Sequence, residues 1–130
     1  MKKSIIALFL LSISTLAFSQ YTQTEGYYSG QGASLRIVVF DISKGVVAAS
    51  TGVTQGSCAG SIAGMGQFVG RTLTITPYEK YEQAPNCKIK VVFDQKCQHA
   101  KIDTDGDCAY YSGAACTWEG QTVAKQKEKN

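Results

Sequence analysis

The feature that most constrains the fold of this chain is a series of short β-like segments separated by glycine-containing turns. β-Branched and aromatic residues fill these segments, and 13 glycines are spread through a sequence of 130 residues. No long segment repeats its apolar residues at the 3.6-residue period of an amphipathic helix. We therefore expect an all-β protein in which helix occurs only briefly.

Seven segments have the composition and the alternating pattern of strands. They are residues 33–40, 46–51, 61–69, 71–78, 87–93, 98–102 and 116–123. Asp and Gly residues predict turns at 41–45 and 103–107. Seven or eight short strands in sequence order indicate an antiparallel meander, and closure into a barrel or sandwich would hide its edges. The expected inward-facing residues are Leu35, Ile37, Val39, Leu73, Ile75, Ile89, Val91, Phe93 and Trp118.

The first 19 residues have the organisation of a secretory signal. Lys2 and Lys3 precede an apolar stretch over 5–16, and the small residues Ala17 and Ser19 suit signal peptidase. The apolar stretch is too short to span a membrane. The sequence thus predicts export to the periplasm, with secretion as an alternative. It also predicts a single β domain over 20–124 and a polar tail over 125–130.

The charge balance does not favour nucleic-acid binding, which usually requires a basic stripe. The chain carries 13 basic and 10 acidic residues, and Lys2 and Lys3 would leave with the signal. Lys125, Lys127 and Lys129 lie in the polar tail. The folded domain is therefore expected to be nearly neutral, without affinity for nucleic acid.

Cysteine usage predicts a disulfide-linked domain. All five cysteines follow the signal, and an oxidising compartment favours disulfides. They are Cys58, Cys87, Cys97, Cys108 and Cys116. Because five is odd, one thiol must stay free or pair with another chain. Cys97 follows an expected turn, so an exposed Cys97 would permit a disulfide-linked dimer, whereas a buried Cys97 would be a free thiol.

The residues that could perform catalysis or bind metal form no recognised pattern. His99 is the only histidine, and no nucleophile motif surrounds it. Asp103, Asp105 and Asp107 lack the glycine and glutamate spacing of a calcium loop. Cys97 and His99 fit no common zinc spacing. We therefore expect neither an enzyme nor a metal or cofactor site.

Two tyrosine-containing segments are better candidates for a binding surface. Tyrosine offers a large contact area at low entropic cost and is frequent among interface hot spots. The candidate residues are Lys80 and Tyr81 in one segment, and Tyr110, Tyr111, Ser112 and Gly113 in the other. Their alternative role is to pack against the mouth of the barrel.

The segment from Cys108 to Gly120, CAYYSGAACTWEG, resembles the C-terminal signature of small exported bacterial lysozyme inhibitors. In that family a cysteine, an aromatic residue or His, a glycine, a second cysteine, an aromatic residue and a final glycine follow in this order. The segment Gly56–Gly60 and the strand that opens at Cys87 are also similar. The resemblance covers roughly residues 54–124.

The resemblance implies a small antiparallel barrel with two disulfides, Cys58–Cys87 and Cys108–Cys116. It also implies a mode of action in which a loop plugs the sugar-binding cleft of lysozyme. Ser112–Ala114 is similar to the Ser-Gly-Ala element that these inhibitors insert. A Cys108–Cys116 bridge would hold this element in one conformation and so lower the ordering cost of binding.

The chain departs from the family after this element. The family has a Trp-x-Lys-Gly-like element, whereas here Trp118 is followed by Glu119 and no lysine. Catalytic carboxylates of a lysozyme would repel a glutamate. Either Lys80 supplies the positive charge from another loop, or the target is a different enzyme.

The function expected from this resemblance is inhibition of a peptidoglycan-degrading enzyme, lysozyme-like, by occlusion of its cleft. One alternative is an immunity protein against a secreted toxin of another cell-wall-hydrolase class, since the same occlusion would serve. A second is a small barrel that binds an apolar ligand, although the bulky inward residues leave little room. A third is a purely structural envelope protein.

Overall fold

The computed structural model of the protein describes residues 20–129, so the expected signal at 1–19 lies outside the described residues. The described part begins with a helical turn over 20–24 and continues into eight strands and one short helix. These are β1 (Gly26–Ser29), β2 (Ala33–Asp41), β3 (Val46–Gln55), β4 (Cys58–Val69), β5 (Thr72–Pro77), β6 (Lys88–Phe93), β7 (His99–Asp105), α2 (Ala109–Ser112) and β8 (Gln121–Lys125). Within this range no helix combines the length and apolarity needed to cross a bilayer.

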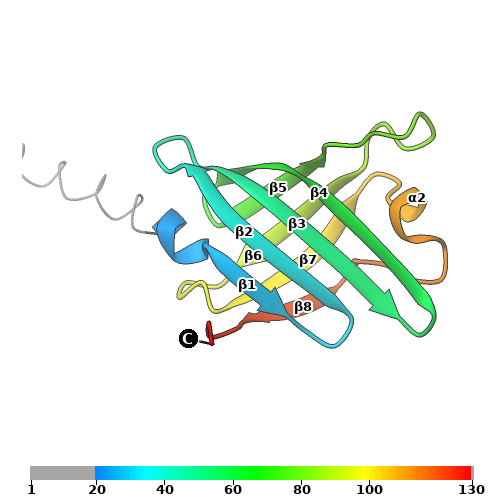
Figure 1. Cartoon of the computed structure of the whole chain (residues 1–130). Coiled ribbons are helices and arrows are strands. Elements are labelled where there is room, and N and C mark those ends of the chain that lie inside the picture. The colour runs from blue at the N-terminus through cyan, green and yellow to red at the C-terminus, as the bar shows by residue number, and fades with distance from the viewer. Residues whose placement is uncertain (1–19, 130) are drawn as a thin grey trace, which may run out of the picture.

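The eight strands form a closed antiparallel barrel, which confirms the predicted meander (Figure 1). Each strand pairs with its neighbour in sequence, and β1 pairs with β8 to close the sheet. The sequence did not predict β1, which has only four residues. β8 begins at Gln121 rather than 116 and runs to Lys125, one residue into the expected tail.

The expected turn at 103–107 begins later than predicted. β7 continues through Asp105, because its polar residues bond to the connection that precedes β8. The Asp103 carboxylate accepts the N–H of Gly120 at 3.0 Å. These bonds supply the polar partners that a turn would otherwise have offered.

Alternate residues of each strand enter the barrel and fill it with side chains. The predicted inward residues are fully or nearly fully buried, except Val39, which is half-buried. The register between β2 and β3 shifts after Val39, and this irregularity turns its side chain partly outward. Tyr28 and Phe68 add two buried rings that the sequence analysis did not assign.

Tyr28 places a hydroxyl inside this apolar core. The hydroxyl oxygen lies 2.8 Å from the carbonyl oxygen of Thr24 and 3.2 Å from that of Cys97. Burial of the side chain raises the pKa of the phenol well above its usual value. The neutral hydroxyl therefore ties the helical turn at 20–24 to the β6–β7 connection.

Replacement of this hydroxyl is expected to destabilise the barrel. Tyr28→Phe should lower the free energy of unfolding by about 1–2 kcal/mol, because the two buried carbonyls lose their donor. Urea denaturation measures the change. Tyr27→Phe is the matched control, since Tyr27 is exposed on the same strand. Equal stability of the two variants would show that the Tyr28 hydroxyl contributes nothing.

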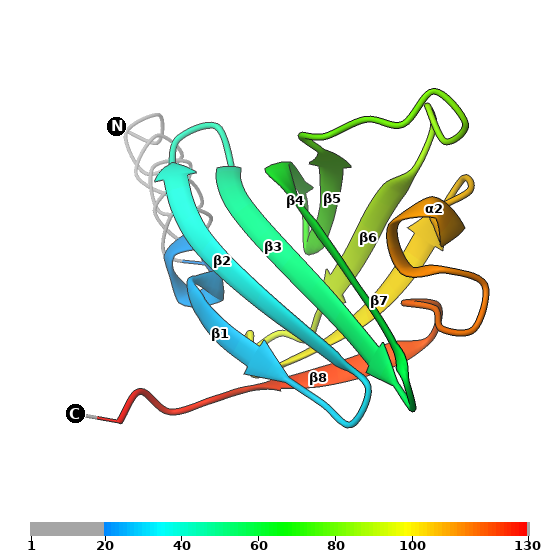
Figure 2. The same cartoon turned by 45° about the vertical axis from the view of Figure 1, so that its right-hand side comes forward.

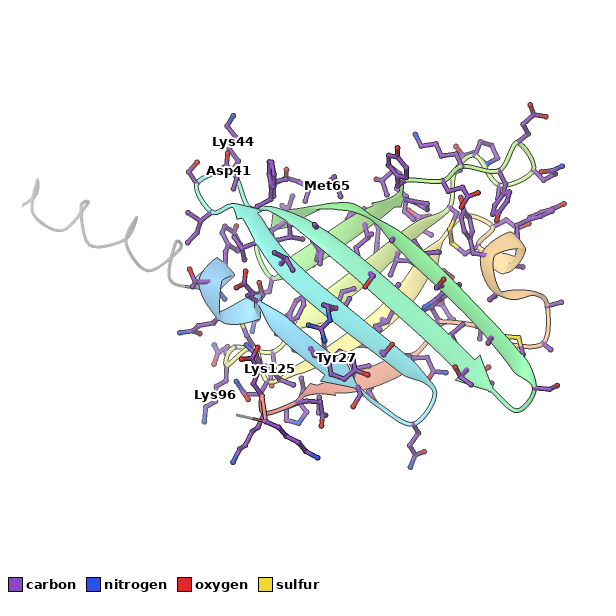
Figure 3. All side chains as sticks on the ribbon, viewed as in Figure 1. Tyr27, Asp41, Lys44, Met65, Lys96 and Lys125 are labelled. Atoms are coloured by element: carbon purple, nitrogen blue, oxygen red, sulfur yellow. A yellow bond between two sulfur atoms is a disulfide. The ribbon has the colours of Figure 1, made fainter. Side chains whose placement is uncertain are left out.

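Successive connections alternate between the two ends of the barrel (Figures 1 and 2). One end carries α2 and the long β5–β6 loop, and we call it the α2 end. The opposite end carries the β2–β3 turn with Asp41 and Lys44, and the β6–β7 turn with Lys96 (Figure 3). The two segments singled out as binding candidates therefore share one end.

The two disulfides use the four expected cysteines, but the pairing implied by the family resemblance is wrong. The bonds are Cys58–Cys116 and Cys87–Cys108, with Cα–Cα distances of 5.9 and 4.9 Å. The reason is that the α2 segment crosses the open end of the barrel. It brings Cys108 to the start of β6 and Cys116 to the start of β4.

Cys97 is the remaining cysteine, and its thiol is free and buried. Only 1% of its surface is exposed, and burial raises the pKa of the thiol. Of the two alternatives, the buried free thiol is therefore confirmed. The exposed thiol that would link two chains is wrong.

Candidate functional site

The α2 segment is held against the barrel at both of its ends. The Cys87–Cys108 bond fixes the residue before α2, and the Cys58–Cys116 bond fixes the segment after it. Between them the backbone of α2 packs directly on β4 at Gly60. A Cβ atom at Gly60 would lie 2.4 Å from the Cα of Ser112. The segment is thus positioned before any partner arrives.

The two predicted tyrosine segments meet at this end. The rings of Tyr81 and Tyr111 lie edge to face with centroids 4.8 Å apart. The hydroxyl of Tyr111 donates to the carbonyl oxygen of Glu79 at 2.8 Å. These two contacts join α2 to the β5–β6 loop, so the residues form one surface instead of two mobile loops.

The exposed residues of this surface are Tyr78, Lys80, Tyr81, Tyr110 and Gly113, and we call them the tyrosine end. Tyr78 is 90% exposed and Tyr110 is 54% exposed. Exposure of large aromatic side chains on a cross-linked scaffold is typical of a recognition surface. From the sequence, Tyr78 is both the last residue of the expected strand 71–78 and the first residue of this tyrosine-containing segment; in the structure β5 ends at Pro77, so Tyr78 belongs to the β5–β6 loop.

The two other predicted residues of the α2 segment face inward. Ser112 is only 9% exposed, and its hydroxyl lies 3.0 Å from the Gly113 carbonyl oxygen and 3.1 Å from that of Cys116. Tyr111 is half-buried against Tyr81. The Ser112 and Tyr111 side chains hold the α2 segment in its conformation, whereas Tyr110 and Gly113 are exposed to solvent.

Glu119, the residue between Trp118 and Gly120, is bound to the barrel. Its carboxylate accepts the N–H of Thr104 at 2.8 Å and the hydroxyl of Thr104 at 2.7 Å. These hydrogen bonds hold the pKa of Glu119 below its usual value. Among residues 20–129, Lys80 makes no ion pair, so it is the free cation of the tyrosine end.

The histidine that the sequence analysis considered for catalysis lies away from the tyrosine end. His99 starts β7 at the opposite end, where its Nδ1 lies 3.2 Å from Asp94 Oδ2. Within residues 20–129, no three His, Cys, Asp or Glu side chains gather closely enough to hold a metal ion.

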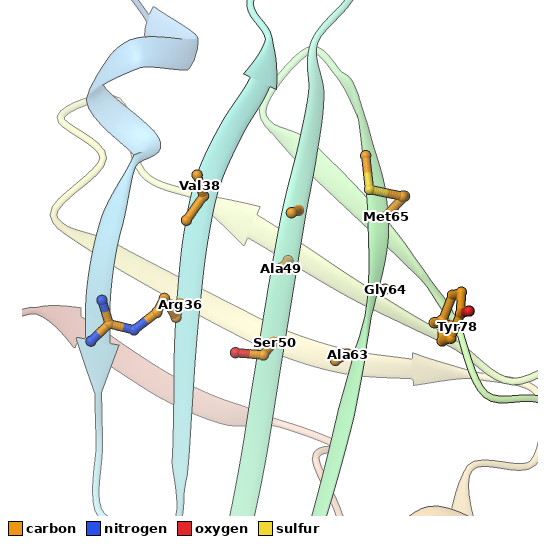
Figure 4. A pocket seen from close by; sticks show the side chains of 9 residues that line it. Arg36, Val38, Ala49, Ser50, Ala63, Gly64, Met65 and Tyr78 are labelled. Atoms are coloured by element: carbon orange, nitrogen blue, oxygen red, sulfur yellow. The ribbon is translucent and has the colours of Figure 1, made fainter.

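An apolar groove of about 410 Å³ lies on the outer face of β2, β3 and β4 (Figure 4). Val38 and Met65 stand on either side of a floor of small residues, and the groove ends at Tyr78. The sequence analysis missed it, although Val38 and Met65 occupy outward positions of their strands. The signal would have been apolar residues on the face that alternation assigns to solvent.

Comparison of the chain with known families, with curated proteins and with solved structures found no match. The fold and the site therefore define a class only: a small disulfide-linked β-barrel with an exposed, cross-linked aromatic end.

Proposed function

We propose that this protein is an exported inhibitor of a peptidoglycan-degrading enzyme, and that the tyrosine end enters the substrate cleft of that enzyme. The observation that carries the proposal is the joining of the two tyrosine segments into one surface by Tyr111 and by two disulfides. A rigid, aromatic end of a small barrel is suited to occlude the substrate cleft of an enzyme.

Preorganisation supports this proposal energetically. A loop that is mobile before binding loses conformational entropy on binding, and cross-links remove part of that cost. Both ends of the α2 segment are bridged to strands of the barrel. Tyr110 therefore needs little further ordering when it contacts a partner.

Lys80 is the residue of the tyrosine end that would suit a target with an acidic cleft, and it lies between two exposed glutamates of the same loop, Glu79 and Glu82. Hydrogen bonds to Thr104 hold Glu119 against the barrel, so it does not project towards a partner. Lys80 remains exposed on the β5–β6 loop. In this proposal Lys80 approaches the catalytic carboxylates and replaces the lysine that the inhibitor family carries elsewhere.

The two bridges are compatible with folding in an oxidising compartment, such as the periplasm. The immunity alternative uses the same surface, and only the identity of the target separates it from a lysozyme inhibitor. The ligand-carrier alternative has less support, because Trp118 and Tyr28 are fully buried inside the barrel.

A turbidity assay tests the proposal. The purified oxidised protein is mixed with c-type and g-type lysozymes, an amidase and an endopeptidase, and lysis of bacterial cell walls is followed. Suppression of one enzyme at near-stoichiometric protein supports inhibition and identifies the blocked chemistry. Suppression of the amidase or endopeptidase alone would favour an immunity protein over a lysozyme inhibitor. Full lysis by every enzyme would contradict the lysozyme target.

Charge reversal at the tyrosine end is expected to weaken inhibition. Lys80→Glu should raise the inhibition constant roughly tenfold or more, because a carboxylate would approach catalytic carboxylates. Lys96→Glu is the matched control, since this substitution makes the same change of charge at the opposite end of the barrel (Figure 3). Tyr110→Ala should raise the inhibition constant by a similar factor, because it removes an exposed aromatic side chain from the contact surface. Equal inhibition by the two lysine variants would place the contact elsewhere.

A further inference from the structure

The first half of β4 has a neighbouring strand on one side only. β4 covers Cys58–Val69 and pairs with β3 from Gln55↔Cys58 to Val46↔Gln67. β5 pairs only with the second half, from Gly64 to Val69. The segment before Ala63 therefore forms an open edge inside an otherwise closed barrel.

The peptide groups that face this edge can be assigned from the hydrogen-bond pattern. The N–H of Phe68 donates to the Gly45 carbonyl at 2.9 Å, so even-numbered residues of β4 face β3. The N–H of Tyr78 donates to the Ala63 carbonyl at 2.8 Å, so odd-numbered residues face away from β3. The β3–β4 register is unbroken, and peptide direction alternates along a strand.

Ala59 and Ser61 share the direction of Ala63. Within the described range 20–129, neither peptide group has a hydrogen-bond partner on the side away from β3. Two N–H and two C=O groups are thus available along one edge. Such a row is a template for pairing with an additional strand.

A cleft of about 390 Å³ lies along this edge. One wall is β4 from Gly60 to Ala63, and the other includes Tyr81 and Tyr111. The ring contact between the two tyrosines and the bond from Tyr111 to Glu79 fix the second wall in place. The cleft is open to solvent on one side of a rigid frame.

The edge carries none of the residue types or irregularities that proteins commonly use to block strand addition. Blocked edges carry charged residues, prolines or bulges. Residues 59–63 read AGSIA, with neither charge nor proline, and their pairing with β3 contains no bulge. The outward side chains are small, so they leave room for another backbone.

We infer that this edge binds an extended segment of a partner protein as an added β-strand, between β4 and the tyrosine wall. Main-chain hydrogen bonds to Ala59 and Ser61 would supply affinity, and an apolar or aromatic side chain against Tyr81 would supply selectivity. The β5–β6 loop and α2 stand beside the edge, so a second barrel could not bring its own β4 edge to it. A single protruding segment fits this geometry.

This binding mode does not rest on the proposed inhibition, and a different probe tests it. Linear twelve-residue peptides displayed on phage are selected on the oxidised protein, and the enriched peptides are synthesised. Binding is measured by fluorescence titration. Hydrogen exchange followed by NMR reports whether the amides of Ala59 and Ser61 become protected when a peptide binds.

A proline substitution provides the sharpest variant. Ser61→Pro removes the edge N–H and leaves the β3–β4 ladder intact, because the Ser61 N–H does not point to β3. It should weaken peptide binding about tenfold or more through the lost hydrogen bond. Ser61→Ala keeps the N–H and should bind within about twofold of the unaltered protein.

Two results would overturn the inference. One is equal peptide affinity for Ser61→Pro and Ser61→Ala. The other is the failure of every tested peptide to protect the Ala59 and Ser61 amides, which is read on the unaltered protein and so does not depend on how a variant folds. Neither result bears on the turbidity assay, which separates this inference from the proposed function.

Discussion

Loss of the Cys58–Cys116 disulfide is expected to lower the free energy of unfolding by about 4 kcal/mol in the double variant Cys58→Ser with Cys116→Ser. The bridge closes a loop with a sequence separation of 58 residues, and the entropy removed from the unfolded chain grows with loop length. The Cys87–Cys108 bridge closes a shorter loop, with a sequence separation of 21 residues. Its removal in the matched double variant should lower the free energy of unfolding by about 3 kcal/mol. Denaturant unfolding of both double variants measures the difference.

The same bond is expected to matter for recognition. Without it, the segment after α2 is no longer fixed to the start of β4, so Tyr110 should lose part of its preorganisation. Inhibition in the turbidity assay should therefore weaken. The assay is run without denaturant, at a temperature at which the variant is still folded. Full inhibition by a folded variant would show that the α2 segment does not carry the contact.

The pairing itself can be checked on the unaltered protein. Trypsin cleavage without reduction places Cys97 in peptide 97–101 and the four bonded cysteines in peptides 45–71, 81–88 and 102–125. The observed pairing links all three into one assembly. The pairing Cys58–Cys87 with Cys108–Cys116 would leave 102–125 as a separate peptide. Detection of that separate peptide would contradict the loop-length argument.

Strand alternation predicted most of the barrel because each strand has one buried face. Leu73 and Ile75 in β5 and Ile89 and Val91 in β6 repeat every second residue, and all four are fully buried. β1 escaped prediction because its four residues offer one buried side chain, Tyr28. Closure of the barrel through β1 and β8 is a property of the whole sheet, not of one segment.

The disulfide pairing could not be read from the sequence, because it depends on how one connection crosses the end of the barrel. Cys108 and Cys116 are close in sequence, yet each bonds to a different strand start. The convergence of Tyr81 with Tyr111 has the same origin. Tyrosine content indicated both segments, but only the placement of α2 over β4 brings them together.

The open edge of β4 was hidden for a related reason. The sequence analysis began this strand only at residue 61, since glycine and alanine weaken a strand pattern. In the fold it pairs regularly with β3 through Gly52 and Val53. Small residues there allow α2 to approach on the inner side and leave the outer side clear.

Gly60→Ala is expected to displace α2 and lower the free energy of unfolding by about 3 kcal/mol. The added methyl group would lie 2.4 Å from the Cα of Ser112 and 2.5 Å from the carbonyl oxygen of Tyr111. Both are backbone atoms, so no side-chain rotation relieves the contact, and overpacking of this kind is costly. Thermal unfolding and hydrogen exchange across residues 109–113 measure the two effects.

Gly52→Ala is the matched control on the adjacent strand. Its added methyl group would meet the Ser34 hydroxyl at 3.1 Å, and that hydroxyl can rotate away. This control should therefore change the free energy of unfolding by less than about 1 kcal/mol. Equal melting temperatures for the two variants would contradict the close packing of α2 on Gly60. A destabilised Gly60→Ala that still inhibits fully below its melting temperature would instead remove α2 from the inhibitory surface and leave the β5–β6 loop as its carrier.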